Sequence, residues 1–258
     1  MAIVTLLTDS GETDHYAAAI KAKILSINPG LTIIDISHKI SPCDIAHGAF
    51  VLKSVFGDFP KGSVHLVAVD STGNSETASI AIQLEDHFFI GADNGLFGLI
   101  SDKTHQQAVD INSVNQIGST FPEKDIFAIA AAKLASGVSI TSLGKPMTSF
   151  KKMIGRSVKA TRKLIAGHVV RVDNFGNLIT NISKTDFDIL SKDKNYTVQF
   201  AREKFRKINS NYHQADQGDC FLIFNSLGFL EIGIYKGRAN ELLGMELDSA
   251  VNILFDEN

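Results

Sequence analysis

The chain has 258 residues, of which 44% are hydrophobic and 21% charged, a balance that predicts a globular protein with a sizeable core. Its formal net charge of −3 gives no general electrostatic attraction to nucleic acid or to an acidic membrane. With two distant cysteines, no signal-peptide pattern and no apolar run of membrane-spanning length, we expect a cytoplasmic protein that binds a small molecule, not nucleic acid or a membrane.

The chain begins with a short predicted strand and an acidic loop. Residues 3–7 form an apolar run of the kind that a strand buried on both faces requires. Asp9 directly follows it, and is expected at the carboxyl edge of a parallel sheet, where α/β folds bind their ligands. Asp14 is a candidate N-cap of a helix that ends at Asn28-Pro29-Gly30. We interpret Asp9 as a ligand-binding residue and Asp14, from its position alone, as a cap.

The next predicted elements follow the order strand, helix, strand: residues 31–36, 44–56 and 64–69. Asp70 comes directly after the last of them, as Asp9 does after the first strand. The residues His38, Asp44 and His47 could suggest a metal site. A helix cap at Asp44 and a solvated neighbour at His47 explain them more simply, so we expect no metal.

The rest of the first half continues this pattern. A polar loop at 71–75 leads to two strands joined by Glu85-Asp86, then to a further strand and an alanine-rich helix: residues 80–84, 87–90, 107–111 and 125–134. The alternation predicts an N-terminal α/β domain, residues 1–150, with a Rossmann-like and mostly parallel sheet.

The composition changes after this domain. Residues 151–164 carry a basic run without sustained periodicity, which indicates a solvated interdomain linker. From residue 165 to 258 the pattern is strand-like, with turn signals between short runs, and predicts a small all-β domain, barrel or sandwich. The expected strands are 168–172, 178–182, 196–200, 221–224, 229–235 and 251–255.

The common catalytic and phosphate-binding motifs are absent from the sequence, including Gly-x-Gly-x-x-Gly after the first strand and the Gly-x-Ser-x-Gly elbow. What remains is a set of acid and amide side chains at loop positions: Asp9, Asp14, Asp70, Asp93, Asn94, Asp173, Asn177 and Asn225. Carboxylates can accept hydrogen bonds from the two neighbouring hydroxyls of a ribose, and amides can form hydrogen bonds with the edge of a base. Such a set suits a nucleoside that carries a positive charge.

The block from Asp173 to Ile182, Asp-Asn-Phe-Gly-Asn-Leu-Ile-Thr-Asn-Ile, sharpens this interpretation. With it the sequence resembles the S-adenosylmethionine hydroxide adenosyltransferases, also called S-adenosylmethionine hydrolases, which are related to fluorinase and chlorinase. The resemblance covers essentially the whole chain, with matching blocks at 7–14, 35–38, 44–49, 59–65, 92–96, 125–127 and 225–232. Each block is weak alone, but together they occur in order and at matching spacing.

The resemblance implies an N-terminal α/β domain, a C-terminal β-barrel and a homotrimer with the ligand at subunit interfaces. It implies cleavage of S-adenosylmethionine to adenosine and methionine by water, without a cofactor or metal. It also implies residue roles. Asp9 would bind the ribose hydroxyls and Asn177 the adenine; Asp14, Asp173 and Ser226 would surround the methionine ammonium and carboxylate; and Phe121, Phe175 and Tyr212 would wall the pocket.

The chain departs from the hydrolases at two positions. In the hydrolases the attacking water is associated with an Asp, an Arg and a His. Asp70 matches the Asp, but the Arg position falls on Thr77 or Ala78 and the His position on Pro122. The polar groups best placed to hold water near the ribose C5′ are then Asp70 and Glu123. As a pair sharing a partly dry pocket, one could stay protonated while the other accepts from water. The alternative is that Glu123 only caps the helix predicted from Asp125.

The halogenase branch fits less well. Its tyrosine corresponds to Asp70, its halide-binding serine to Glu123, and its inserted loop is missing between Leu84 and His87. Leu227 also stands where fluorinase has an arginine for the substrate carboxylate. The predicted function is hydrolysis of S-adenosylmethionine. A binding protein that has lost the chemistry and an adenosyl transferase with another nucleophile are the alternatives.

Overall fold

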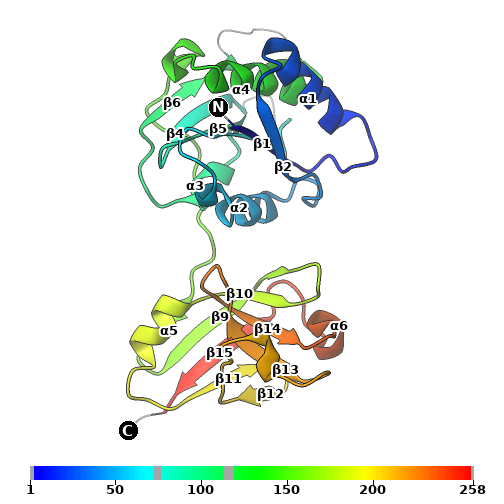
Figure 1. Cartoon of the computed structure of the whole chain (residues 1–258). Helices are drawn as coiled ribbons and strands as arrows, with labels where there is room; N and C mark the ends of the chain where they lie inside the picture. Colours follow the sequence, from blue (N-terminus) through cyan, green and yellow to red (C-terminus); the bar gives the residue numbers. More distant parts are fainter. Residues whose placement is uncertain (1–2, 73–76, 113–118, 257–258) are drawn as a thin grey trace. The chain divides into compact units, whose positions relative to one another are not determined.

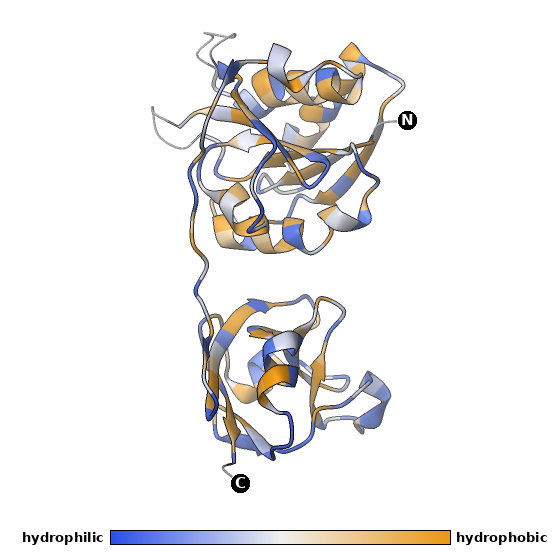
Figure 2. Ribbon diagram, turned by 90° about the vertical axis from the view of Figure 1, so that its left-hand side faces the viewer, coloured by the Kyte–Doolittle hydropathy of each residue, from blue (hydrophilic) through white to orange (hydrophobic). Residues whose placement is uncertain are grey.

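The computed structural model describes residues 3–72, 77–112 and 119–256, which form two compact units (Figure 1). The first unit extends to Gly155 and the second begins at Arg156, a boundary that falls within the predicted linker 151–164. Figure 2 shows hydrophobic residues concentrated in the strands and helices and hydrophilic ones in many connecting loops. Of the polar loop predicted at 71–75, residues 73–75 lie outside the described residues.

The first unit is built on a seven-stranded sheet with the order β2-β1-β3-β5-β4-β6-β7. The strands β2, β1, β3 and β5 are parallel, and β4, β6 and β7 are added antiparallel. Their bounds are β1 Ile3–Thr8, β2 Thr32–Ser37, β3 Val64–Ala68, β4 Ser79–Leu84, β5 His87–Ala92, β6 Gln107–Asp110 and β7 Lys145–Pro146. The α/β class is confirmed, but the sheet is mixed.

The turn between β4 and β5 explains the mixed character. Glu85 and Asp86 both have positive φ angles, 51° and 65°. Two consecutive residues of this kind form the tight turn whose twist suits a β-hairpin, and a hairpin necessarily reverses the strand direction. The pairing of Leu84 with His87 closes it.

Helices cover both faces of this sheet. In Figure 1, α1 and α4 lie on one side and α2 and α3 on the other. Side chains alternate along β1, so Leu6 joins the core under α1 and α4 while Leu7 joins the core under α2 and α3; both are fully buried. This confirms β1 as a strand buried on two faces. The helices are α1 Tyr16–Ile27, α2 Ile45–Lys53, α3 Leu96–Ile100 and α4 Ala128–Ala135.

The helix starts differ from the predictions in two places. Asp14 does not cap α1: His15 holds the cap position without a side-chain cap bond, and its carbonyl accepts the first helical hydrogen bond, from Ala19 N at 2.9 Å. The chain makes a turn through Asp14, so the helix begins later. In contrast, the Asp44 side chain caps α2 by accepting from His47 N at 2.9 Å, as predicted. The helix expected from Asp125 begins earlier, with a π-helical turn at Glu123–Phe127 before α4.

The second unit is an eight-stranded antiparallel sheet with the order β12-β11-β15-β9-β10-β14-β13, in which β8 also pairs with β9. The strands are β8 Lys159–Ala160, β9 Leu164–Val172, β10 Leu178–Ser183, β11 Tyr196–Phe200, β12 Glu203–Phe205, β13 Cys220–Phe224, β14 Phe229–Ile234 and β15 Ala250–Phe255. Two short helices, α5 Lys184–Leu190 and α6 Ala239–Leu243, complete it.

This sheet is curled rather than fully closed. Its end strands are β12 and β13, and the chain after β12 reaches β13 through an isolated bridge between Asn209 and Ile223. The predicted all-β barrel is therefore corrected to an antiparallel half-barrel with two helices. Across both units, none of the described helices is long and apolar enough to span a membrane.

Candidate ligand-binding and catalytic site

Asp9 is the centre of a cluster at the carboxyl ends of β1 and β3. Its Oδ2 accepts hydrogen bonds from two backbone N–H groups, those of Cys43 at 2.9 Å and Asp70 at 3.1 Å. Both donors adopt left-handed backbone, with φ of 59° at Cys43 and 47° at Asp70, a conformation that is uncommon for residues other than glycine. The charge-assisted bonds to Asp9 help to hold these two residues in it. Asp70 is thereby fixed beside Asp9.

Glu123 lies near the same centre. Burial raises the pKa of Glu123, its own backbone N–H and the nearby Ser71 side chain oppose this rise, and the negative charge of Asp9 adds to it. Ser71 Oγ is buried and lies near the Glu123 carboxyl group. The predicted residues Asp9, Asp70 and Glu123 are thus brought together. Glu123 is the first residue of the helical turn, and Pro122 holds the cap position without a side-chain cap bond, so the capping role that the alternative assigned to Glu123 is not observed.

Cys43 is a member of this cluster that sequence reasoning missed. Desolvation and the negative charges of Asp70 and Asp9 raise the pKa of the Cys43 thiol, and a hydrogen bond between the thiol and the Asp70 side chain adds to the effect. The thiol therefore stays protonated at neutral pH and is a poor nucleophile. In the sequence, Cys43 follows Ser41-Pro42 in a polar connection, and no local pattern there predicts a contact with Asp9 or Asp70.

Phe121 and Asp14 come from the two segments beside this cluster. The Phe121 ring makes edge contacts with Tyr16, at 5.4 Å between centroids, and with His15, at 6.5 Å. It is therefore packed on the start of α1, as a wall residue would be. Asp14 is exposed, and its carboxylate accepts a 3.5 Å hydrogen bond from the Thr13 hydroxyl. The structure does not bring Asp14 into contact with Asp9.

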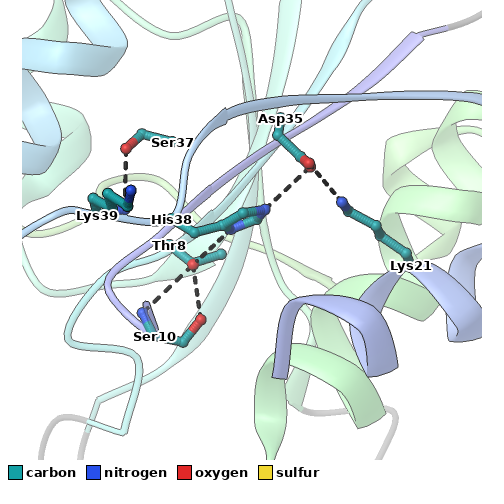
Figure 3. Close-up of polar contacts among 7 residues, drawn as sticks. All are labelled: Thr8, Ser10, Lys21, Asp35, Ser37, His38 and Lys39. Atoms are coloured by element: carbon teal, nitrogen blue, oxygen red, sulfur yellow. Dashed lines mark hydrogen bonds and ion pairs between the residues drawn. The ribbon is translucent and has the colours of Figure 1, made fainter. Parts of the chain in front are cut away.

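A buried polar network fixes the end of β1 (Figure 3). Thr8 Oγ1 lies 2.9 Å from His38 Nδ1 and 2.9 Å from Ser10 Oγ. His38 Nε2 lies 3.2 Å from Asp35 Oδ1, a contact that is an ion pair only when His38 is protonated. These contacts give His38 a structural role in the loop that carries Asp9. Among the described residues, no group of three or more potential ligands could hold a metal ion.

The second unit contains a cavity of about 400 Å³ in which three predicted residues meet, Phe175, Asn177 and Tyr212. Phe175 is 73% exposed, which is unusual for an aromatic side chain and typical of a ligand-contacting wall. The other lining residues are Asn174, Phe221, Ile234, Tyr235, Lys236, Gly237 and Arg238. An aromatic wall with an amide at its edge can stack on a planar base and read it.

Asp173 shapes one side of this cavity. Its Oδ1 accepts from Phe175 N at 2.9 Å and Asn177 N at 2.8 Å, and its Oδ2 accepts from Asn177 Nδ2 at 3.2 Å. Gly176 has a φ of 84°, and a Cβ there would lie 2.9 Å from Arg238 Cβ, so the turn requires glycine. Asp173 therefore orients the Asn177 amide, whose carbonyl remains available to a base.

Ser226 belongs to the exposed turn between β13 and β14. Asn225 Oδ1 holds this turn by accepting from Leu227 N at 3.0 Å and Phe229 N at 3.2 Å. The Asn225 Nδ2 group donates to Glu231 Oε2 at 3.1 Å, and the Tyr212 hydroxyl donates to Glu231 Oε1 at 3.1 Å. Glu231 thus connects the turn of Ser226 with the cavity wall. Sequence reasoning assigned no role to Glu231.

Two family profiles match the chain. The profile described as SAM hydroxide adenosyltransferase N-terminal domain matches residues 4–144. The profile of the corresponding C-terminal domain matches residues 167–252. Together they cover most of both units and include Asp9, Asp70, Asp173 and Asn177.

Individual proteins are similar over the same range. The (R)-S-adenosyl-L-methionine hydrolase of Methanocaldococcus jannaschii is 32% identical, with 98% of this chain and 96% of that protein covered. The fluorinase of an Actinoplanes species is 26% identical over 72% of this chain and 73% of its own length. A crystal structure of an uncharacterized conserved protein from Thermotoga maritima superimposes with a TM-score of 0.86 at 29% identity, covering 98% of this chain and 99% of that one.

Proposed function

The chain belongs to the S-adenosylmethionine hydroxide adenosyltransferase family, and from this premise we propose that it hydrolyses S-adenosylmethionine to adenosine and L-methionine. The observation that carries the proposal is the convergence of Asp9, Asp70 and Glu123 at one sheet edge. The second unit supplies the complementary part, a cavity with an amide and aromatic walls. Acid groups for a ribose and an amide for a base are what a nucleoside substrate requires.

The reaction is a single displacement. A water oxygen attacks the ribose C5′, the bond between C5′ and sulfur breaks, and its electron pair leaves with methionine as a neutral thioether. The water loses one proton to a base. Because the leaving group is already activated as a sulfonium, the protein has to align the water with the breaking bond and keep the nucleophile poorly solvated.

Asp70 and Glu123 are the residues that we assign to the water. The raised pKa of Glu123 favours a protonated carboxyl that can donate to the water, while Asp70 accepts a proton from it. The buried Ser71 hydroxyl beside Glu123 is a further polar group at this position. The resemblance places the family's Arg position at Thr77 or Ala78 and its His position at Pro122, and this pair of carboxyl groups would perform the task of those side chains.

The remaining assignments follow the family. Asp9 would bind the ribose diol, Asn177 the adenine, and Phe121, Phe175 and Tyr212 the faces of the nucleoside. Asp14, Asp173 and Ser226 would bind the methionine end. No cofactor is required, and we propose a cytoplasmic homotrimer in which neighbouring subunits complete each site. The division of the assigned residues between two units supports a composite site.

The test is incubation of the full chain with S-adenosylmethionine and chromatography of the products. Adenosine and methionine in equal amounts are expected, and oxygen-18 from labelled water should appear in the adenosine 5′-hydroxyl. Binding of S-adenosylmethionine without release of adenosine would replace hydrolysis by the binding-protein alternative. A 5′-modified adenosine formed only with an added nucleophile would support the adenosyl transferase.

A further inference from the structure

We propose that Glu231 is a specificity-determining residue that selects the cationic sulfonium substrate over neutral adenosyl compounds. The inference deepens the proposed function and rests on it. It concerns the cavity of the second unit and assigns a task to a buried carboxylate that the displacement reaction does not use. The argument depends on the position, partners and charge of this one side chain.

Glu231 lies on the cavity side of β14. Glu231 and Gly233 are two residues apart on one strand, so they share a face of the sheet. A Cβ built at Gly233 would lie 2.1 Å from the Phe221 ring and 2.7 Å from Asn177 Oδ1. Phe221 and Asn177 both line the cavity, whereas Ile232, on the opposite face, is fully buried in the core. The Tyr212 hydroxyl donates to Glu231, so the carboxylate lies directly behind the cavity wall.

The two hydrogen-bond partners of Glu231 carry no positive charge. The side chain is 4% exposed, and its hydrogen bonds come from the Tyr212 hydroxyl and the Asn225 amide. Both donors are neutral, and a buried carboxylate without a cation is costly. Burial raises the pKa of Glu231, the two hydrogen bonds oppose this rise, and the negative charge of Asp173 adds to it. A positively charged ligand would relieve this excess of negative charge.

The surrounding charges favour the same conclusion. Asp173 also contributes to a pKa of about 12 for Tyr212, after burial and Glu231, so the phenol stays neutral and donates. Arg171 lies in the same cross-strand row as Glu231, with Ile179 between them. The groups that face Glu231 are thus Tyr212, Asn225, Asp173 and, across β10, Arg171. Two carboxylates behind the cavity wall attract a sulfonium, but give no such gain with a neutral thioether; the ammonium group is common to S-adenosylmethionine and S-adenosylhomocysteine and does not distinguish them.

The experiment is calorimetric titration of the full chain with S-adenosylmethionine and with S-adenosylhomocysteine, which lacks the sulfonium methyl and its charge. The substitution Glu231→Gln should weaken S-adenosylmethionine binding by at least about tenfold, which corresponds to about 1.4 kcal/mol, while S-adenosylhomocysteine binding changes by less than about threefold. Adenosine, the neutral product without an amino acid, should behave as S-adenosylhomocysteine does. The readout is the ratio of the two affinities.

The matched control is Tyr212→Phe, which removes one hydrogen bond to Glu231 and leaves its carboxyl group in place. This variant should weaken the binding of both ligands by similar factors and leave the ratio of the two affinities unchanged. An unchanged affinity ratio in Glu231→Gln would overturn the inference. If both ligands lose affinity equally, the role of Glu231 is merely structural; if neither loses affinity, Glu231 has no role in binding. If the parent protein binds none of the three ligands, the proposed function fails and the inference fails with it, a result distinct from either of these.

A measurement on the unmodified chain covers the case in which Glu231→Gln does not fold. As the pH falls through the raised pKa of Glu231, the carboxylate is neutralised and the preference for S-adenosylmethionine over S-adenosylhomocysteine should shrink. The same pH series in Asp173→Asn separates the contribution of the second carboxylate to this preference. A preference that does not change with pH in either protein would contradict the inference.

Discussion

At the scale of single residues, Asp9 is the group on which the first-unit cluster depends, because one of its oxygens holds two strained backbone segments. The loop after β1 thus fixes Cys43 and Asp70, and in the proposed function it also presents a carboxylate to the ribose. A substitution at Asp9 should affect both. Stability and affinity therefore have to be measured together.

The substitution Asp9→Ala should weaken binding of S-adenosylmethionine by on the order of a hundredfold. Two hydrogen bonds to a charged acceptor contribute roughly 1.5–3 kcal/mol each, and 1.4 kcal/mol is a factor of ten. Calorimetry measures the affinity and thermal unfolding the stability. The variant Asp9→Asn keeps one acceptor oxygen for the backbone N–H groups of Cys43 and Asp70. It therefore separates the loss of the ribose contact from the loss of these two backbone hydrogen bonds. Unchanged affinity in folded Asp9→Ala would exclude the ribose role.

The pair that we assign to the water gives a kinetic prediction. Asp70→Asn and Glu123→Gln should each lower turnover by about 10²–10⁴-fold, the range for a lost general acid or base, while substrate affinity changes only a few-fold. Steady-state and single-turnover rates of adenosine release check this. The control is Thr77→Ser, a conservative change at one of the two positions, Thr77 or Ala78, where the resemblance places the family's Arg; it should keep the parental rate. Full activity of both carboxylate variants would mean that the water is held elsewhere.

At the scale of elements, β14 is the strand that brings the cavity residues together. The substitution Gly233→Ala would place a methyl group against Phe221 and Asn177 at distances no side chain tolerates. We expect nucleoside affinity to fall at least tenfold and the free energy of unfolding to fall by about 1–3 kcal/mol, the usual cost of overpacking. The control is Gly57→Ala, where a Cβ meets nothing within 4 Å. Equal effects in the two variants would contradict the cavity assignment.

The strands β3 and β5 contain a second testable feature, a pair of buried histidines. His65 is fully buried; its Nδ1 lies 2.7 Å from Thr5 Oγ1, and its Nε2 lies 3.2 Å from His87 Nδ1. Burial, with the charge of His87 as a lesser cause, lowers the pKa of His65 to about 3. Below pH 6.5, His65 binds a proton in the unfolded chain but stays neutral in the folded chain until the pH approaches 3. Stability should therefore fall as the pH decreases from about 6.5 towards 3.

Urea unfolding at a series of pH values measures this effect. The contribution of His65 to the loss is at most about 1.4 kcal/mol per pH unit within that window. The variant His65→Gln cannot take up the proton, so its stability should depend less on pH, even if it is lower at neutral pH. An equally steep pH dependence in the variant would assign the acid sensitivity to other groups.

At the scale of the whole molecule, each unit has its own buried core. A fragment of residues 1–155 should therefore fold, yet fail to bind S-adenosylmethionine, because Asp173, Asn177 and Tyr212 lie in the second unit. The circular dichroism spectrum and calorimetry test the two statements. Tight binding by the fragment would show that the second unit is dispensable for the ligand.

The full chain should sediment as a closed trimer, whose mass does not grow further with concentration. The variant Asp9→Asn serves as a control, since the loss of a ligand contact should not change the assembly. A monomer that binds S-adenosylmethionine tightly would contradict the proposal that neighbouring subunits complete each site.

The sequence by itself determined the parts of this protein that depend on local patterns. The apolar run before Asp9 predicts a strand buried on two faces, and Asp44 predicts a cap; both are confirmed, because periodicity and capping involve residues close in the chain. The same local reasoning misplaced the cap at Asp14, whereas the cap position of α1 is His15, one residue later. The matching blocks also predicted the family, since motif order and spacing are properties of the sequence alone.

Only the tertiary structure decided which distant residues share a site. The left-handed backbone of Cys43 and Asp70 is set by their bonds to Asp9, 34 and 61 residues away. Glu231 gains its importance from Tyr212 and Asn225, which reach it from separate segments. The open half-barrel likewise depends on strand pairings that no local pattern encodes. The physical reason is that burial, charge and strain at these positions arise from contacts that exist only after the chain has folded.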